Sequence, residues 1–281
     1  MERREAREIL ITGCSSGIGL CVARGLQARG YRVFATARRA EDVQRLRDEG
    51  LHSYRLDLDD SASIQQAVDQ VLEATGGHLY ALFNNGAYGQ PGAVEDLPRA
   101  ALREQFETNV FGWLELTNRV IPVMRAQGCG RILQNSSVLG IVALPYRGAY
   151  NASKFAIEGF SDTLRMELHG SGVHVSLIEP GPILSKFRNN SHLAYLKHID
   201  ASGSVHRQAY ATMEKRLTEE HAAVPFTLPP DAVLKRVIHA LEARRPKVRY
   251  PVTVPTYVFA WLKRILPHRG LDAAIRRLHR S

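Results

Sequence analysis

The sequence predicts a single α/β domain in which helices cover both faces of one parallel β-sheet. Short apolar runs alternate with longer helical patterns along the chain, which is typical of β-α-β units. No internal repeat or low-complexity linker interrupts this alternation. Because crossovers between parallel strands are right-handed, the sheet is expected to be doubly wound, with ligands beyond the carboxyl ends of its strands.

Six short apolar runs are the predicted strands. The first, E-I-L-I-T, leads directly into a glycine, and the sixth ends at E-P-G-P. Their length suits strands better than helices. The predicted strands are residues 8–12, 31–35, 52–56, 79–83, 131–135 and 173–178.

Four longer patterns with helical period are the predicted helices between these strands. Gly30, Gly76 and Gly170 follow three of them, and glycine is common just after a helix C-terminus. Pro122 lies inside the third pattern and predicts a kink there. The predicted helices are residues 17–29, 61–74, 97–126 and 147–169.

The positive charge of the chain is concentrated near its C-terminus. The formal net charge is +9, and residues 231–281 contain twelve Lys and Arg against three Asp and Glu. The rest of the chain is therefore close to neutral, and any argument about acidic partners concerns this part alone.

Cysteine and histidine usage predicts reduced thiols and no metal site. Cys14, Cys21 and Cys129 form no C-x-x-C pair, and the eleven histidines form no ligand motif. The N-terminus lacks the apolar core of a signal peptide, and no apolar run is long enough to span a membrane. We expect a cytoplasmic protein.

A glycine-rich loop joins the first strand to the first helix. Residues 12–19 read T-G-C-S-S-G-I-G. Gly13 permits a sharp turn, while Gly17 and Gly19 allow a ligand to approach closely. The helix start then offers N–H groups to a phosphate. The alternative, a plain glycine turn, is less favoured because a strand precedes the loop and a helix follows it.

Tyr150 and Lys154, in A-Y-N-A-S-K-F, lie one helical turn apart and share one face. With T-G-x-x-x-G-I-G and Tyr-x-x-x-Lys together, the chain resembles the short-chain dehydrogenase/reductase superfamily over about residues 8–250. The run Y-N-A-S-K-F-A-I-E-G-F looks like the steroid and retinol dehydrogenase branch, and K-V-R-Y-P-V-T looks like bacterial NADP-dependent aldehyde reductases. The resemblance implies a Rossmann-like oxidoreductase whose catalytic residues are Asn109, Ser137, Tyr150 and Lys154.

The end of the second strand predicts the cofactor. An acidic residue there would bind the ribose of NAD, whereas arginine suits the 2′-phosphate of NADP. Ala37 stands where the acid is expected, and Arg38 and Arg39 follow. Because a guanidinium binds phosphate oxygens through two donors, we predict NADP(H) with Arg38 as the leading contact. The alternative is two solvated arginines.

The resemblance also implies the other cofactor contacts. In N-N-G-A, Asn84 to Ala87, glycine and alanine are exchanged relative to the family's Asn-Asn-Ala-Gly, and because both Gly86 and Ala87 are small, the close approach to the adenosine side is expected to be kept. The implied contacts are Gly13, Ser15, Ser16, Gly17, Ile18, Gly19, Arg38, Asp57, Leu58, Asn85, Gly86, Tyr150, Lys154, Pro180, Gly181 and Ile183.

The chemistry of carbonyl reduction explains why these residue types are needed. Tyrosine has a pKa near 10, and a neighbouring ammonium such as Lys154 is expected to lower it. Ser137 is expected to stabilise charge on the substrate oxygen. Asn109 would position a water that links Lys154 to solvent, as the resemblance implies.

The substrate side follows the sixth strand. Residues 183–226 are expected to form a lid, and their aromatic and aliphatic residues suggest a hydrophobic pocket. The expected substrate contacts are Ser137, Tyr146, Tyr150 and Phe187, and the expected substrate is a lipophilic aldehyde or ketone or its alcohol. The rival readings are an epimerase or dehydratase on the same fold, and a dinucleotide-binding regulator without turnover.

Residues 251–281 are predicted to be a basic amphipathic helical extension after a catalytic domain of residues 1–250. They could contact an anionic membrane as interfacial helices, but covering the core or a subunit interface is the favoured reading. No nucleic-acid motif is present, so nucleic acid is not an expected partner. A homo-oligomer, either a dimer or a tetramer, is expected.

Overall fold

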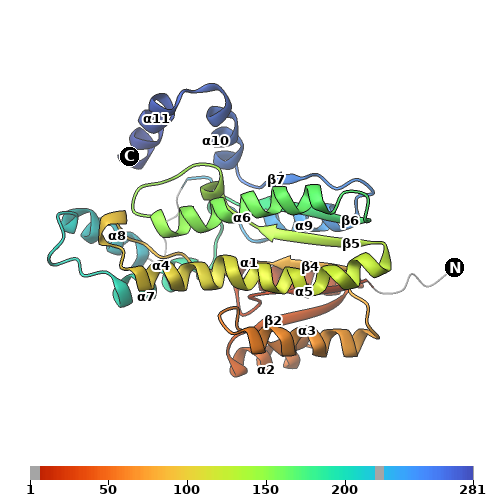
Figure 1. Ribbon diagram of the computed structural model, residues 1–281. Helices are drawn as coiled ribbons and strands as arrows, with labels where there is room; N and C mark the ends of the chain where they lie inside the picture. Colours follow the sequence, from red (N-terminus) through yellow and green to blue (C-terminus); the bar gives the residue numbers. More distant parts are fainter. Residues whose placement is uncertain (1–6, 219–224, 281) are drawn as a thin grey trace.

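A computed structural model describes residues 7–218 and 225–280, with side chains up to Arg277. All the strands named in it are parallel and form one sheet in the order β3-β2-β1-β4-β5-β6-β7 (Figure 1). The strand order reverses at β1 and β4, which creates a crevice at the carboxyl ends. The strands are β1 (Glu8–Ile11), β2 (Arg32–Ala37), β3 (His52–Arg55), β4 (Ala81–Asn84), β5 (Gly130–Asn135), β6 (Val173–Glu179) and β7 (Arg249–Pro251).

Helices cover both faces of this sheet, which confirms the doubly wound, Rossmann-like architecture. On one face, Val22, Leu46 and Val237 belong to one buried apolar cluster, from α1 (Gly17–Ala28), α2 (Ala40–Asp48) and α9 (Asp231–Glu242). On the other face, Ile64, Trp113 and Ile157 belong to a second cluster. They come from α3 (Ser61–Thr75), α5 (Gly112–Gln127) and α6 (Gly148–Glu167).

The structure adds α2, α9 and β7 to the predicted elements of the sheet and its covering helices, and it divides the long predicted helix. That helix consists of α4 (Arg99–Phe106), a π-helical turn η2 (Glu107–Phe111) and α5. Helix α5 contains Pro122, and the π turn before it was not expected.

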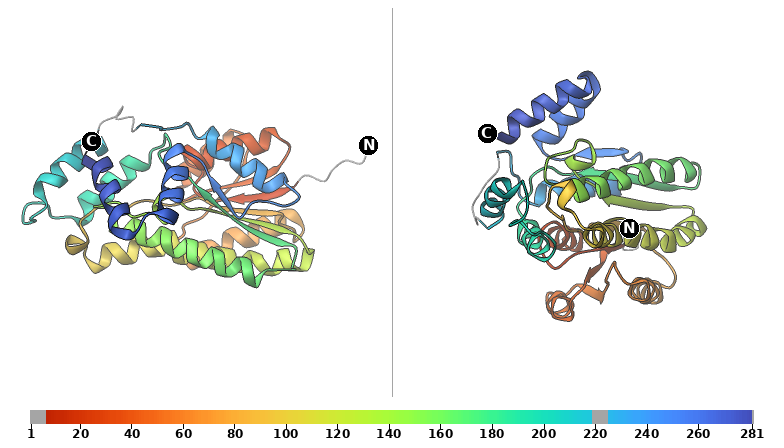
Figure 2. Two further views of the ribbon diagram at one scale, coloured as in Figure 1. Left: turned by 90° about the horizontal axis from the view of Figure 1, so that it is seen from above. Right: turned by 60° about the vertical axis from the view of Figure 1, so that its left-hand side comes forward.

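The lid region contains two helices beyond the carboxyl ends of the strands (Figure 1). They are α7 (Phe187–His198) and α8 (Arg207–Thr218); residues 219–224 of the predicted lid lie outside the described residues. After β7, α10 (Val254–Ile265) and α11 (His268–Arg280) stand beyond the β7 edge of the sheet (Figure 2). Within the described residues, no helix has the length and apolar character needed to cross a membrane.

Candidate active site

The glycine loop after β1 packs directly against the segment after β4. A Cβ atom at Gly13 would lie 2.6 Å from Gly86 Cα, and one at Gly19 would lie 2.3 Å from the Gly13 carbonyl oxygen. Gly13 and Gly17 also have positive φ angles of 71° and 57°. Glycine is therefore required at these positions by backbone conformation and by close packing.

The N-terminus of α1 is open to an anion. Ser16 is the N-cap but its side chain makes no capping hydrogen bond, and the first turn holds no acidic residue. The N–H groups and the helix dipole at this end favour negative charge, so the loop fits the phosphates of a dinucleotide. Ser185 lies above this loop, because a Cβ at Gly17 would come within 3.0 Å of its Cβ.

Arg45 on α2 supports the same loop, although the sequence analysis did not identify it. Its Nη2 atom donates a hydrogen bond of 2.7 Å to the Ser15 carbonyl oxygen. It also pairs with Asp42 and Glu49 at 3.0 and 3.1 Å. Recognising the segment A-E-D-V-Q-R-L-R-D as a helix would have been the sequence signal for this contact of Arg45.

The residues predicted for the nucleoside end of a cofactor lie at neighbouring strand ends. Arg38 directly follows β2, is exposed, and its carbonyl oxygen accepts a 3.2 Å hydrogen bond from Arg55 Nε. Asp57 follows β3, and its N–H donates to Ser63 Oγ at 3.0 Å. The side chain of the next residue, Leu58, is close to Gly86, because a Cβ at Gly86 would lie 3.3 Å from its Cδ1.

Asn85 ties the carboxyl ends of three strands together. Its Nδ2 donates to the Thr12 carbonyl oxygen at 3.0 Å, and its Oδ1 accepts from Asn135 Nδ2 at 2.9 Å. The N–H of Gly86 donates to Thr12 Oγ1 at 2.8 Å. A Cβ at Gly86 would meet its nearest atoms at 3.3 Å, so an alanine there would need only a small adjustment of its neighbours. The glycine–alanine exchange therefore does not demand a different backbone path.

Asn109 lies in the π-helical turn, and π turns are frequent at functional sites. The buried Asn109 clamps the backbone of Tyr88: its Nδ2 donates to the Tyr88 carbonyl oxygen at 2.9 Å and its Oδ1 accepts from the Tyr88 N–H at 3.2 Å. Its Nδ2 also donates to Ser153 Oγ at 3.2 Å. Ser153 Oγ in turn donates to the Tyr150 carbonyl oxygen at 2.8 Å. The network connects Asn109 to the helix that carries Tyr150.

Ser137 begins the short 3₁₀ helix η3 (Val138–Gly140), and its Oγ accepts a 3.1 Å hydrogen bond from the Leu139 N–H. The Pro180 carbonyl oxygen after β6 accepts from the Val138 N–H at 2.8 Å. Gly181 is packed so closely that a Cβ there would lie 2.1 Å from Thr253 Oγ1. The loops after β5 and β6 thus hold each other in place around Ser137.

Tyr150 is 9% exposed, and its ring contacts Phe187 of the lid at 5.3 Å between centroids. Its pKa is raised to about 12 because burial disfavours the phenolate, whereas a hydrogen bond with Ser137 and the charge of Arg147 lower it. The net direction is opposite to the lowering expected from Lys154. In the protein alone, burial outweighs the nearby charges.

Lys154 is 1% exposed and lies beside Tyr150 as its spacing predicted. Its Nζ donates to the Asn135 carbonyl oxygen at 2.8 Å, and it lies 5.6 Å from the centre of the Tyr150 ring. The Nζ also lies 4.3 Å from the Trp113 ring centre, a cation–π contact. Burial lowers the pKa of Lys154 to about 7, although the Glu158 charge raises it.

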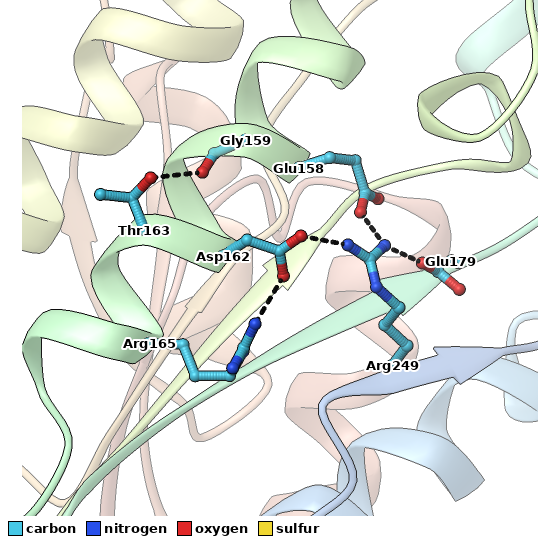
Figure 3. A network of polar contacts seen from close by, with 7 residues as sticks. All are labelled: Glu158, Gly159, Asp162, Thr163, Arg165, Glu179 and Arg249. Atoms are coloured by element: carbon cyan, nitrogen blue, oxygen red, sulfur yellow. Dashed lines mark hydrogen bonds and ion pairs between the residues drawn. The ribbon is translucent and has the colours of Figure 1, made fainter.

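A charged cluster behind Lys154 was not identified from the sequence. Arg249 of β7 bridges Glu158 and Asp162 of α6 and Glu179 of β6 (Figure 3). Its distances to Asp162 and Glu179 are both 2.7 Å. Burial raises the pKa of Glu179 to about 7, and the Glu158 charge adds to this. The cluster ties α6, the helix that carries Tyr150 and Lys154, to strands β6 and β7.

Tyr146 has a positive φ of 59° and packs against the lid. Its ring lies 5.5 Å from that of His206 and 6.2 Å from that of Tyr210. Tyr195 and Tyr210 are 3% and 0% exposed in this aromatic cluster. The two lid tyrosines therefore anchor the lid rather than line an open pocket, whereas Phe187 contacts Tyr150 directly.

Comparisons with known proteins agree with this geometry. The family model of short chain dehydrogenases matches residues 7–195. The chain is 42% identical to the uncharacterized oxidoreductase YbbO of Escherichia coli over 266 residues, which cover 95% of this chain and 93% of that one.

Two other relatives have more specific names. The NADPH-dependent 3-dehydrocapnine reductase of Ornithobacterium rhinotracheale is 31% identical, with 95% of each chain covered. Human 17-beta-hydroxysteroid dehydrogenase type 1 is 33% identical, with 87% of this chain and 77% of that one covered.

Solved structures show the same fold. A short-chain dehydrogenase from Streptomyces avermitilis aligns with a TM-score of 0.77 and 26% identity, covering 98% of this chain and 96% of that one. The matched residues 7–195 include the glycine loop, Asn109, Ser137, Tyr150 and Lys154. The chain therefore belongs to the short-chain dehydrogenase/reductase family of oxidoreductases.

Proposed function

We propose that this protein is an NADP(H)-dependent oxidoreductase that interconverts a lipophilic aldehyde or ketone and its alcohol, with Tyr150 as the acid/base. The observation that carries the proposal is the position of Lys154 Nζ, 5.6 Å from the Tyr150 ring centre, beside a tyrosine whose pKa Ser137 lowers. Two neighbouring hydroxyl groups suit a single carbonyl oxygen. Tyr150 would donate the proton and Ser137 would stabilise the developing charge.

The pKa of Tyr150 supports reduction at neutral pH. A phenol whose pKa is about 12 is protonated at pH 7, which is the form that carbonyl reduction requires. Oxidation of an alcohol would need the phenolate, which the Ser137 hydrogen bond and the Arg147 charge favour. Lys154 would support the same proton transfer, with Asn109 connecting it to solvent as proposed from the family.

NADP(H) is the proposed cofactor because Arg38 follows β2 where an acidic residue would favour NAD. One relative is itself named an NADPH-dependent reductase. Hydride exchange with the carbonyl carbon is the chemistry that this cofactor supplies when bound. The glycine loop, Arg38, Asp57, Asn85 and the segment from Pro180 to Ile183 would hold it.

The lipophilic substrate is proposed from the apolar surroundings of Tyr150, of which Phe187 is the nearest named contact. We also propose a cytoplasmic homo-oligomer, either a dimer or a tetramer. Phe111 and Phe160, which are 51% and 47% exposed near the helical layer of α5 and α6, would suit a subunit contact. Light scattering of the purified protein measures this directly.

The test is NADPH consumption with a panel of aldehydes, ketones, steroids and retinoids, in the wild type and in Tyr150→Phe. Phenylalanine keeps the ring that packs on Phe187 and removes only the hydroxyl group. Loss of a positioned acid should lower kcat about 100-fold or more. Unchanged turnover in Tyr150→Phe would disprove the role of Tyr150.

The panel also separates the rival functions. A dinucleotide-binding regulator would bind NADPH tightly and turn over no carbonyl. An epimerase or dehydratase would convert its substrate without net consumption of NADPH.

A further inference from the structure

We propose that the protein docks reversibly on anionic lipid membranes through an exposed apolar stripe on α10. The stripe consists of Val254, Tyr257, Val258, Trp261 and Ile265, which are 52%, 49%, 44%, 61% and 52% exposed. Their spacing of three or four residues places them on one face of the helix. A stripe of this size, with a tryptophan and a tyrosine, is unusual on a surface that faces only water.

The opposite side of α10 is already occupied by the protein. Phe259 and Ala260 pack in a cluster with Ile141, Val142 and Ile275. Lys263 Nζ donates a 2.6 Å hydrogen bond to the Ile141 carbonyl oxygen. The inner face therefore attaches α10 to the rest of the protein. The outer stripe is not needed to cover the core, so covering the core does not explain why the stripe is apolar.

Basic side chains border the stripe. Arg264 lies next to Ile265, and Arg236 of α9 donates a 3.3 Å hydrogen bond to the Tyr257 hydroxyl. Helix α11 exposes Arg269, Arg276 and Arg277, and Asp272 is its acidic residue in the described part of the chain. Apolar and aromatic residues beside arginines are the composition of helices that lie in the interface of an anionic membrane.

A second copy of the chain fits this surface less well than lipid does. A two-fold interface would place the same patch against itself, so the basic border of one copy would face that of the other. Like charges at such a contact oppose association. Anionic headgroups instead complement the arginines while the stripe enters the acyl boundary.

The position of the stripe relates docking to the candidate active site. The cluster that holds α10 includes Val138 and Ile141, in the segment that follows Ser137. Figure 2 shows that α11 runs from α10 towards the end of the molecule that carries α7 and α8. Docking would therefore bring that end close to lipid, where a lipophilic substrate would partition; this last consequence rests on the proposed function.

The experiment is co-sedimentation of the full chain with vesicles of phosphatidylcholine alone or mixed equally with phosphatidylglycerol. The test variant is Trp261→Ser with Ile265→Ser, and the matched control is Met166→Ser, whose side chain is 63% exposed on α6. We expect binding to the mixed vesicles that weakens with added salt, and about a tenfold or greater loss in the double variant. The control should bind like the wild type.

Tryptophan emission provides a second measurement. The chain has two tryptophans, and Trp113 is fully buried while Trp261 is 61% exposed. A blue shift on adding anionic vesicles would therefore report Trp261 entering lipid. A charge variant, Arg264→Glu with Arg269→Glu, should also lose binding while leaving the apolar stripe intact.

Three results would overturn the proposal. They are no binding by the wild type, equal binding to neutral and mixed vesicles, and unchanged binding in the double variant. If the wild type does not bind vesicles and the double variant has a lower mass than the wild type by light scattering, the stripe is instead an interface between copies of the chain. NADPH turnover is assayed separately without vesicles, so failure of docking and failure of the proposed function are distinguishable.

Discussion

Replacing Arg249 with methionine should destabilise the protein in a pH-dependent way. The change removes the cation that bridges Glu158, Asp162 and Glu179 (Figure 3). The Glu158 and Glu179 side chains are only 8% and 2% exposed, so they would remain buried without it. Removing one member of a buried ion pair costs about 3–5 kcal/mol, and the lower end applies because Arg249 is itself 35% exposed.

The cost should be about 3 kcal/mol at pH 8 and smaller at pH 6. The pKa of Glu179 is already raised to about 7, and loss of Arg249, which lowers it, would raise it further. A carboxyl group with a raised folded-state pKa stabilises the fold at low pH, and this contribution is lost as pH rises through that pKa. Protonation of Glu179 at pH 6 should therefore recover about 1.4 kcal/mol of the free energy of unfolding for each further unit by which its pKa rises.

The assay is urea unfolding at both pH values, followed by the change in tryptophan emission, to which the exposure of the buried Trp113 contributes. The matched control is Arg165→Met, because Arg165 pairs with Asp162 between side chains that are 36% and 39% exposed. The control should cost less than about 1 kcal/mol at either pH. The reasoning fails if Arg249→Met costs no more than the control, or costs the same at pH 8 and pH 6.

Further predictions concern the cofactor and the reacting residues. Arg38→Asp should weaken NADPH binding at least about tenfold, as measured by fluorescence titration, and unchanged affinity would remove Arg38 from the cofactor site. Gly181→Ala should cost about 1–3 kcal/mol in urea unfolding because its methyl group collides with Thr253. The cost should fall in a Thr253→Ala background, and no such relief would contradict the collision. Arg147→Gln should move the pH profile of alcohol oxidation to higher pH, since Arg147 lowers the pKa of Tyr150; an unmoved profile would argue against this influence.

The strands that pair in the centre of the sheet could be located from the sequence because each contains a short run rich in apolar residues, such as I-L-I in β1 and A-L-F in β4. Two other elements, β7 and α2, could not. Strand β7 has three residues, R-Y-P, which give almost no hydrophobic signal, and α2 buries only Val43 and Leu46. The π turn at Glu107–Phe111 adds no break to the helical pattern, so only hydrogen bonding reveals it.

For the site, spacing predicted that Tyr150 and Lys154 lie together, and the structure agrees. The spacing did not predict the net effect of burial on the pKa values of these two residues, because burial depends on the whole fold. The Arg249 cluster could not be predicted from the sequence either, because its members come from α6, β6 and β7 and share no local pattern.

The closeness of Ser185 to Gly17 links the glycine loop to the surroundings of Tyr150. Ser185 lies over the N-terminal end of α1, and two residues later Phe187 contacts Tyr150. A shift of Ser185 on binding of a dinucleotide would therefore also shift Phe187 relative to Tyr150. We expect binding of the dinucleotide and access of the substrate to Tyr150 to be coupled through this segment.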